Sequence, residues 1–124
     1  MALSAKHLPL AGCLILLLEN ESVIAQSIAD CLQDAGALVQ AAAKIDDALR
    51  IAEDPHLSAA VLDLDLGDED STVVCRLLSA RAIPFLFYSG YDDDYVCDKW
   101  PNATVVIKPA GEQVLIAALL GLLR

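Results

Sequence analysis

Chemically capable side chains stand directly at the ends of four separate apolar runs of the chain. Glu19 and Asn20 follow the first of these runs, and Asp63, Ser89 and Lys108 follow three later ones. Carboxylate and amide oxygens are the ligands that a hard divalent cation such as Mg²⁺ prefers. A lysine ammonium and a serine hydroxyl can bind phosphoryl oxygens, and an aspartate can itself accept a phosphoryl group. These residue types therefore indicate metal-assisted phosphoryl transfer.

Taken singly, each of these residues has a simpler explanation. An Asp after a strand is commonly a turn former or a helix cap, and Ser-Gly and Lys-Pro steps are common at turns and strand ends. The combination is more informative, because the residues lie at the ends of different apolar runs. In an open parallel sheet, side chains just beyond the carboxyl ends of the strands gather in one crevice. We therefore expect one acidic pocket that also contains a hydroxyl and an ammonium.

The elements that must position this pocket follow from an alternation of short apolar runs with segments of helical period, which predicts a parallel α/β sheet. The expected strands lie at 13–18, 38–42, 58–62, 84–88 and 104–107, and the expected helices at 24–35, 45–52, 73–78 and 114–122. Ser22 is a suitable cap for the first helix, and Gly36 is suitable for the position just beyond its end. Residues 89–103 contain three consecutive aspartates and a Trp-Pro step, so the fourth helix is expected to be short or irregular.

Length and composition place these elements in one folded domain over residues 1–124, with residues 1–11 as an N-terminal extension and no output domain expected. Hydrophobic residues make up 56% of the chain, which excludes a disordered protein. The formal net charge of −10 argues against nucleic acid as a partner. The longest apolar stretch, Leu8 to Leu18, is far shorter than the ~20 residues that cross a bilayer, so no membrane span is expected.

The cysteines indicate a reducing compartment. Cys13, Cys31, Cys75 and Cys97 show neither a CxxC motif nor metal-ligand spacing, so we expect free thiols and a cytoplasmic location. Export is the alternative, because Leu10-Ala11-Gly12-Cys13 has the pattern of a lipoprotein cleavage site. Most of the apolar run follows Cys13, however, whereas a signal sequence carries its apolar region before the cleavage site.

As a set, the strand-end motifs resemble the receiver domains of bacterial two-component response regulators. The resemblance covers residues 12–124 and rests on LILLLENE, AAVLDLDLG, PFLFYSGY and VVIKPA. It implies a flavodoxin-like, doubly wound sheet of five parallel strands in the order 2-1-3-4-5. The resemblance also implies that Asp63 is the phosphorylated residue. Glu19 and Asn20 would be the acidic pair that binds Mg²⁺, together with Asp63 and the carbonyl of Asp65. Ser89 would be the switch hydroxyl, Lys108 would contact the phosphoryl group, and the Lys108-Pro109 peptide would be cis.

Two positions depart from the family pattern. Asn20 stands where the family normally has an aspartate that touches the metal, so the site keeps an oxygen ligand but loses a charge. Val105 stands where the family often has an aromatic ring that swings inward on activation. We therefore expect weaker metal binding and no such ring movement.

Three functions remain open. The first is a stand-alone, non-enzymatic phospho-receiver that takes its phosphoryl group from a histidine kinase or a phosphotransfer protein and signals to a downstream protein target. The second is a degenerate receiver that binds partners independently of phosphorylation, because Asn20 has disabled the metal site. The third is a haloacid dehalogenase-like phosphatase, because Asp63-Leu64-Asp65 looks like its DxD motif. That match is partial, since only Glu112 follows the lysine as a further acidic ligand.

Overall fold

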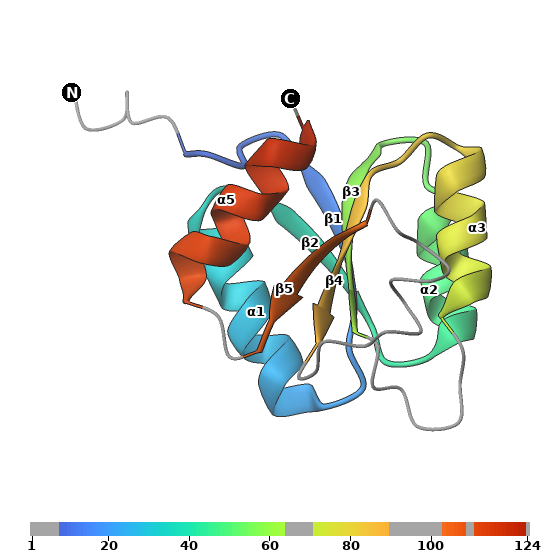
Figure 1. The fold of residues 1–124 in the computed structure, drawn as a ribbon, viewed down its shortest axis with the longest axis horizontal. Helices are drawn as coiled ribbons and strands as arrows, with labels where there is room; N and C mark the ends of the chain where they lie inside the picture. Colours follow the sequence, from blue (N-terminus) through green and yellow to red (C-terminus); the bar gives the residue numbers. More distant parts are fainter. Residues whose placement is uncertain (1–7, 64–70, 90–102, 109–110, 124) are drawn as a thin grey trace.

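The structure is a computed structural model that describes residues 8–63, 71–89, 103–108 and 111–123. Its described elements are β1 (Leu14–Leu18), α1 (Ser22–Asp34), β2 (Leu38–Ala42), α2 (Ile45–Ala52), β3 (Leu57–Asp63), α3 (Thr72–Ala80), β4 (Phe85–Ser89), β5 (Thr104–Ile107) and α5 (Glu112–Leu123). The strands form one parallel sheet in the order β2-β1-β3-β4-β5 (Figure 1). This confirms the flavodoxin-like fold and the strand order.

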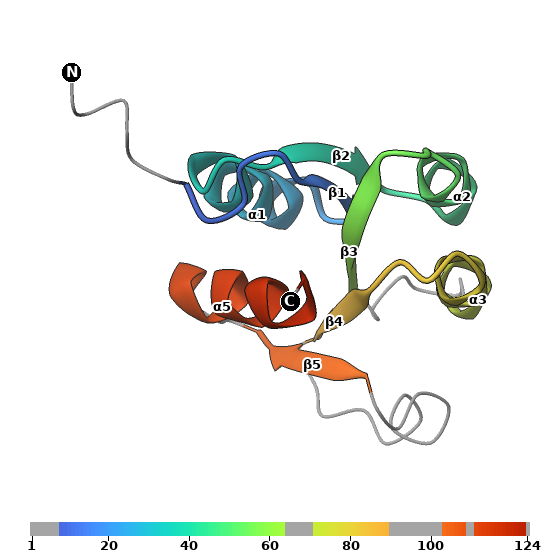
Figure 2. The ribbon, with the colours of Figure 1, turned by 90° about the horizontal axis from the view of Figure 1, so that it is seen from above.

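Helices cover both faces of the sheet. Figure 2 shows α1 and α5 on one face and α2 and α3 on the other. Each face has its own apolar cluster, and successive strand residues alternate between them: Leu17 and Val61 pack toward α1 and α5, whereas Leu16 and Leu62 pack toward α2 and α3. The central strands are therefore buried on both sides, which explains why β1 is an unbroken apolar run.

The start of α1 corrects one prediction. Ser22 is the first helical residue rather than the cap, and Glu21 occupies the N-cap position without a side-chain hydrogen bond. The turn is held instead by Glu19, whose carboxylate accepts a hydrogen bond from the Glu21 backbone N–H at 3.2 Å. At the other end of the helix, Gly36 follows as expected, with a φ of +102° that favours glycine.

Part of the N-terminal extension packs on the domain. Leu10 is fully buried, and its backbone N–H donates to the Ala35 carbonyl at 2.7 Å.

Cys13, Cys31 and Cys75 are free thiols. Within the described residues, no helix is long and apolar enough to cross a bilayer. The segment expected to form a short or irregular fourth helix, the Lys108-Pro109 peptide expected to be cis, Asp65 and Cys97 lie wholly or partly outside the described residues.

Candidate functional site

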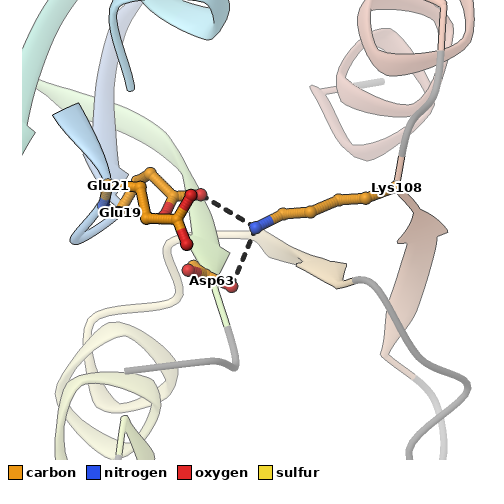
Figure 3. A network of polar contacts seen from close by, with 4 residues as sticks. All are labelled: Glu19, Glu21, Asp63 and Lys108. Carbon is orange, nitrogen blue, oxygen red and sulfur yellow. Dashed lines mark hydrogen bonds and ion pairs between the residues drawn. The ribbon is translucent and has the colours of Figure 1, made fainter. Parts of the chain in front are cut away.

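Three of the predicted site residues meet at the carboxyl edge of the sheet. The Lys108 ammonium lies 2.9 Å from Glu19 Oε1 and 3.1 Å from Asp63 Oδ1, and donates a hydrogen bond to each carboxylate. Figure 3 shows the lysine reaching across from the end of β5 toward the two acidic side chains. The expected convergence of Glu19, Asp63 and Lys108 is therefore observed.

Strand periodicity explains why these three side chains share one face. Side chains two residues apart on a strand point to the same side of the sheet. Leu17, Val61 and Val106 all belong to the cluster beneath α1 and α5. Glu19, Asp63 and Lys108 stand two residues further along the same three chain segments. The three polar residues therefore continue that apolar face at its edge.

The pocket is almost closed to solvent. The side chains of Glu19 and Asp63 are 1% and 2% exposed, and that of Lys108 is 16% exposed. Burial raises the pKa of Glu19 above its ordinary 4.5, and the adjacent Asp63 carboxyl raises this pKa further, although Lys108 and the Glu21 N–H lower it. For Lys108, burial lowers the pKa, but its hydrogen bonds to the two carboxylates outweigh burial and leave the pKa above 10.5.

The charge in this pocket is unbalanced, because two carboxylates share one ammonium. Oxygen ligands with excess negative charge suit a hard divalent cation. Among the residues that the structure describes, no group of three or more His, Cys, Asp or Glu side chains could hold a metal on its own. The donor set fits Mg²⁺ only if the Asn20 amide, the Asp65 carbonyl or water completes the coordination.

The other predicted residues are placed less centrally. Ser89 is fully buried at the end of β4, and its carbonyl accepts a hydrogen bond from the Lys108 backbone N–H at 2.6 Å. Asn20 is exposed and, with Glu19, lines a cavity of 310 Å³ between α1 and the end of β2. Asn20 therefore lies next to Glu19 and is open to solvent, but Asp63 and Lys108 do not line this cavity.

One neighbour of the lysine is absent from the sequence predictions. The Lys108 ammonium lies over the ring of Tyr88, 5.5 Å from its centre. Successive side chains on a strand point to opposite faces of the sheet. The choice of Ser89 as a candidate site residue therefore did not suggest that its neighbour Tyr88 also lies near the site. The signal that could have found it is its alternation with Phe87 on β4, which assigns Tyr88 to the face that carries Asp63.

No family model matches the chain, and no curated protein matches it. Solved structures do match. The chain is 36% identical to SdrG from Pseudomonas melonis Fr1, whose BeF3-activated conformation was determined in solution; the match covers 92% of this chain and 98% of SdrG, with a TM-score of 0.75.

Two further structures share the fold at lower identity. The chain is 22% identical to the Vibrio cholerae chemotaxis protein CheY4, with 91% of this chain and 100% of that chain covered and a TM-score of 0.79. It is 24% identical to a Burkholderia pseudomallei response regulator whose structure contains a phosphorylated aspartic acid and a calcium ion. That match covers 86% of this chain and 66% of that chain, with a TM-score of 0.76.

The likeness to SdrG extends over nearly the whole of both chains, and other matched structures are response regulator receiver domains. This chain belongs to the receiver domain family of response regulators. Receiver domains generally serve phospho-accepting signalling and are generally not enzymes, so family membership favours a signalling role over the phosphatase alternative.

Proposed function

We propose that the chain accepts a phosphoryl group on Asp63 and passes the signal on through protein-protein contacts. The observation that carries this proposal is the Lys108 ammonium, which contacts both Glu19 and Asp63 in a buried pocket. The phosphorylated aspartic acid of the Burkholderia structure and the BeF3-activated state of SdrG support it. We infer that the phosphodonor is a histidine kinase or phosphotransfer protein in the cytoplasm and that the signal passes to a downstream target protein.

The chemistry follows from the positions of the side chains. A carboxylate oxygen of Asp63 forms a bond to phosphorus while the bond between phosphorus and the donor atom breaks, and the donor keeps that electron pair. Lys108 already lies within hydrogen-bond distance of Asp63, so its ammonium can stabilise the negative charge of the transferred group. The Ser89 hydroxyl is proposed to bind another phosphoryl oxygen, which would couple phosphorylation to the end of β4.

Mg²⁺ is the proposed cofactor. Glu19, Asn20 and Asp63 would hold it together with the carbonyl of Asp65, and it would neutralise charge between the carboxylates and the phosphoryl oxygens. Because Asn20 contributes no charge, we expect this chain to bind Mg²⁺ more weakly than a receiver with an aspartate there.

Phosphorylation by a small acyl phosphate tests the assignment of Asp63. The chain is incubated with Mg²⁺ and acetyl phosphate, and its intact mass is measured. The wild type, Asp65→Asn and Asp46→Asn are expected to gain one phosphoryl group, since Asp65 is the nearest rival and Asp46 is an exposed aspartate of α2. Asp63→Asn should gain none. If it still gains the mass, the phosphoryl acceptor is another residue.

A second candidate function rests on Asn20 and on the ion pairs of Lys108. The loss of one carboxylate and the partial neutralisation of the other two both weaken the case for a bound metal. The alternative is a receiver fold that binds its partner without phosphorylation. The same assay separates the two, because a wild-type chain that gains no mass at high Mg²⁺ would favour the binding module.

A further inference from the structure

The side chain of Lys108 must cross a strand to reach its partners. Lys108 follows β5 and Asp63 ends β3, and β4 lies between these two strands in the sheet. Neighbouring strands lie about 4.8 Å apart, so the residue bridges about 10 Å from β5 to β3. The side chain that β4 presents on this face must therefore lie beneath the lysine.

That side chain is Tyr88. In the register of the sheet, Tyr88 stands opposite Asp63 on one side and opposite Val106 on the other. It belongs to the cluster beneath α1 and α5, whereas Phe87 belongs to the cluster on the other face. The Lys108 ammonium lies 5.5 Å from the centre of the Tyr88 ring. This is within the ~6 Å at which a cation is attracted to an aromatic face.

The ring itself is firmly held. Tyr88 is 8% exposed and shares its cluster with Val106 from β5 and with Leu115 and Leu119 from α5. A ring packed in this way cannot turn out to solvent without opening the core. Tyr88 therefore offers the lysine a fixed surface.

We propose that Tyr88 is a positioning residue for Lys108. The aromatic ring of Tyr88 holds the lysine ammonium in the position from which it contacts Asp63. This inference rests on the proposed acceptance of a phosphoryl group by Asp63, and it adds Tyr88 as a residue that organises the same site. A lysine has a long, flexible stem and a single point charge, so it needs a fixed surface to hold one geometry. An aliphatic residue at position 88 would shield the stem but would not attract the charge.

Three variants test this role. Tyr88→Phe keeps the ring, Tyr88→Leu removes the ring and keeps an apolar side chain, and Phe87→Leu removes a neighbouring buried ring from the opposite face. Two properties are measured in each variant. The first is the NMR shift of the Lys108 ε-methylene group, which the ring current of Tyr88 displaces. The second is the rate of phosphorylation by acetyl phosphate at saturating Mg²⁺, with the Mg²⁺ affinity measured separately.

We expect Tyr88→Phe and Phe87→Leu to keep the ε-methylene shift and to react within about twofold of the wild-type rate. Tyr88→Leu should lose the shift and react about fivefold more slowly, with an unchanged Mg²⁺ affinity. Because a general loss of core packing would slow Phe87→Leu equally, this pattern is not expected of a merely structural residue. If Tyr88→Leu does not fold, Tyr88→Met takes its place.

The outcomes separate this inference from the proposed function. A wild-type chain that gains no phosphoryl group would overturn both. A wild-type chain that is phosphorylated, with Tyr88→Leu at the same rate or Tyr88→Phe as slow as Tyr88→Leu, would overturn the positioning role alone. An ε-methylene shift that persists in Tyr88→Leu would also overturn it, because the ring would then not be the surface that holds the lysine.

Discussion

Lys108 and Glu19 form an ion pair of 2.9 Å although their strands, β5 and β1, are separated by β3 and β4 in the sheet. The same ammonium also contacts Asp63 at the end of β3. One side chain therefore connects the carboxyl ends of three strands, and its one positive charge is shared by two buried carboxylates. The site therefore has an excess of negative charge. A bound cation would reduce this excess, and removal of the lysine ammonium would increase it.

Removal of the ammonium should destabilise the domain. In Lys108→Met, Glu19 and Asp63 remain buried without a cation. Loss of one partner of a buried pair costs about 3–5 kcal/mol, and we expect about 2–4 kcal/mol here because the lysine is partly exposed. Urea denaturation at pH 7 measures the change in the free energy of unfolding. Lys44→Met at an exposed position is the control, and an equal loss in both variants would contradict the prediction.

The pH dependence of that difference follows from the raised pKa of Lys108. A raised folded-state pKa stabilises the protein fully below the unfolded value, near 10.5, and this stabilisation disappears as the pH rises through the folded pKa. The wild type and Lys108→Met should therefore differ by a constant amount near neutral pH and converge in strongly alkaline solution. A difference that grows with alkaline pH would contradict this sign.

Glu19 should make the fold less stable as it ionises. Its folded-state pKa lies above 4.5, so the folded state binds this proton more tightly than the unfolded state does. Relative to Glu19→Gln, the wild type should lose free energy of unfolding as the pH rises from 4.5 through the raised pKa, and should lose no more beyond it. Urea denaturation of both chains across this range checks the prediction. A wild type that gains stability relative to the variant would contradict it.

The fold could be predicted because its local signals agree. The run Leu14–Leu18 is apolar at every position, as a strand covered on both faces requires, and Leu38–Ala42 and Thr104–Ile107 were predicted with the bounds that the structure shows. The order of the strands came from the resemblance to receiver domains, because pairing between distant segments leaves little trace in the local sequence.

The site could be predicted only in part, for a related reason. Residue types at strand ends named Glu19, Asp63 and Lys108, but the contact of the lysine with Tyr88 depends on β4 lying between β3 and β5. Ser22 was assigned a capping role from its residue type. In the folded chain the carboxylate of Glu19 holds that turn instead, a contact that residue type and position did not reveal.

Gly36 should tolerate no side chain. Its φ is +102°, and a Cβ there would lie 2.8 Å from Leu8 Cβ and 2.9 Å from the Ala11 backbone nitrogen. Gly36→Ala should lower the free energy of unfolding by about 2–4 kcal/mol, from backbone strain together with overpacking. Gly12→Ala is the matched control, since Gly12 has a φ of +82° but nothing within 4 Å of a Cβ, and should lose about 1 kcal/mol. Equal losses in the two variants would show that the N-terminal contact does not matter.

Replacement of Asn20 by Asp should strengthen the proposed metal site. The change adds a negative charge beside a divalent cation, and unit charges ~4 Å apart at an effective dielectric constant of about 20 attract by about 4 kcal/mol. Repulsion from Glu19 and Asp63 and desolvation of the new carboxylate oppose this gain. We therefore expect Mg²⁺ binding to tighten about tenfold, a net gain of about 1–2 kcal/mol. Calorimetric titration with Mg²⁺ measures the affinity.

The apo form of Asn20→Asp should be slightly less stable than the wild type, because three carboxylates then share the one ammonium of Lys108. Gln33→Glu adds the same charge on an exposed residue near the opposite end of α1, and controls for the overall charge of the domain. If the affinity rises equally in both variants, the gain comes from long-range charge. An affinity that stays the same or falls in Asn20→Asp would mean that residue 20 does not bind the metal, and that the cation is held by Glu19 and Asp63 from another side.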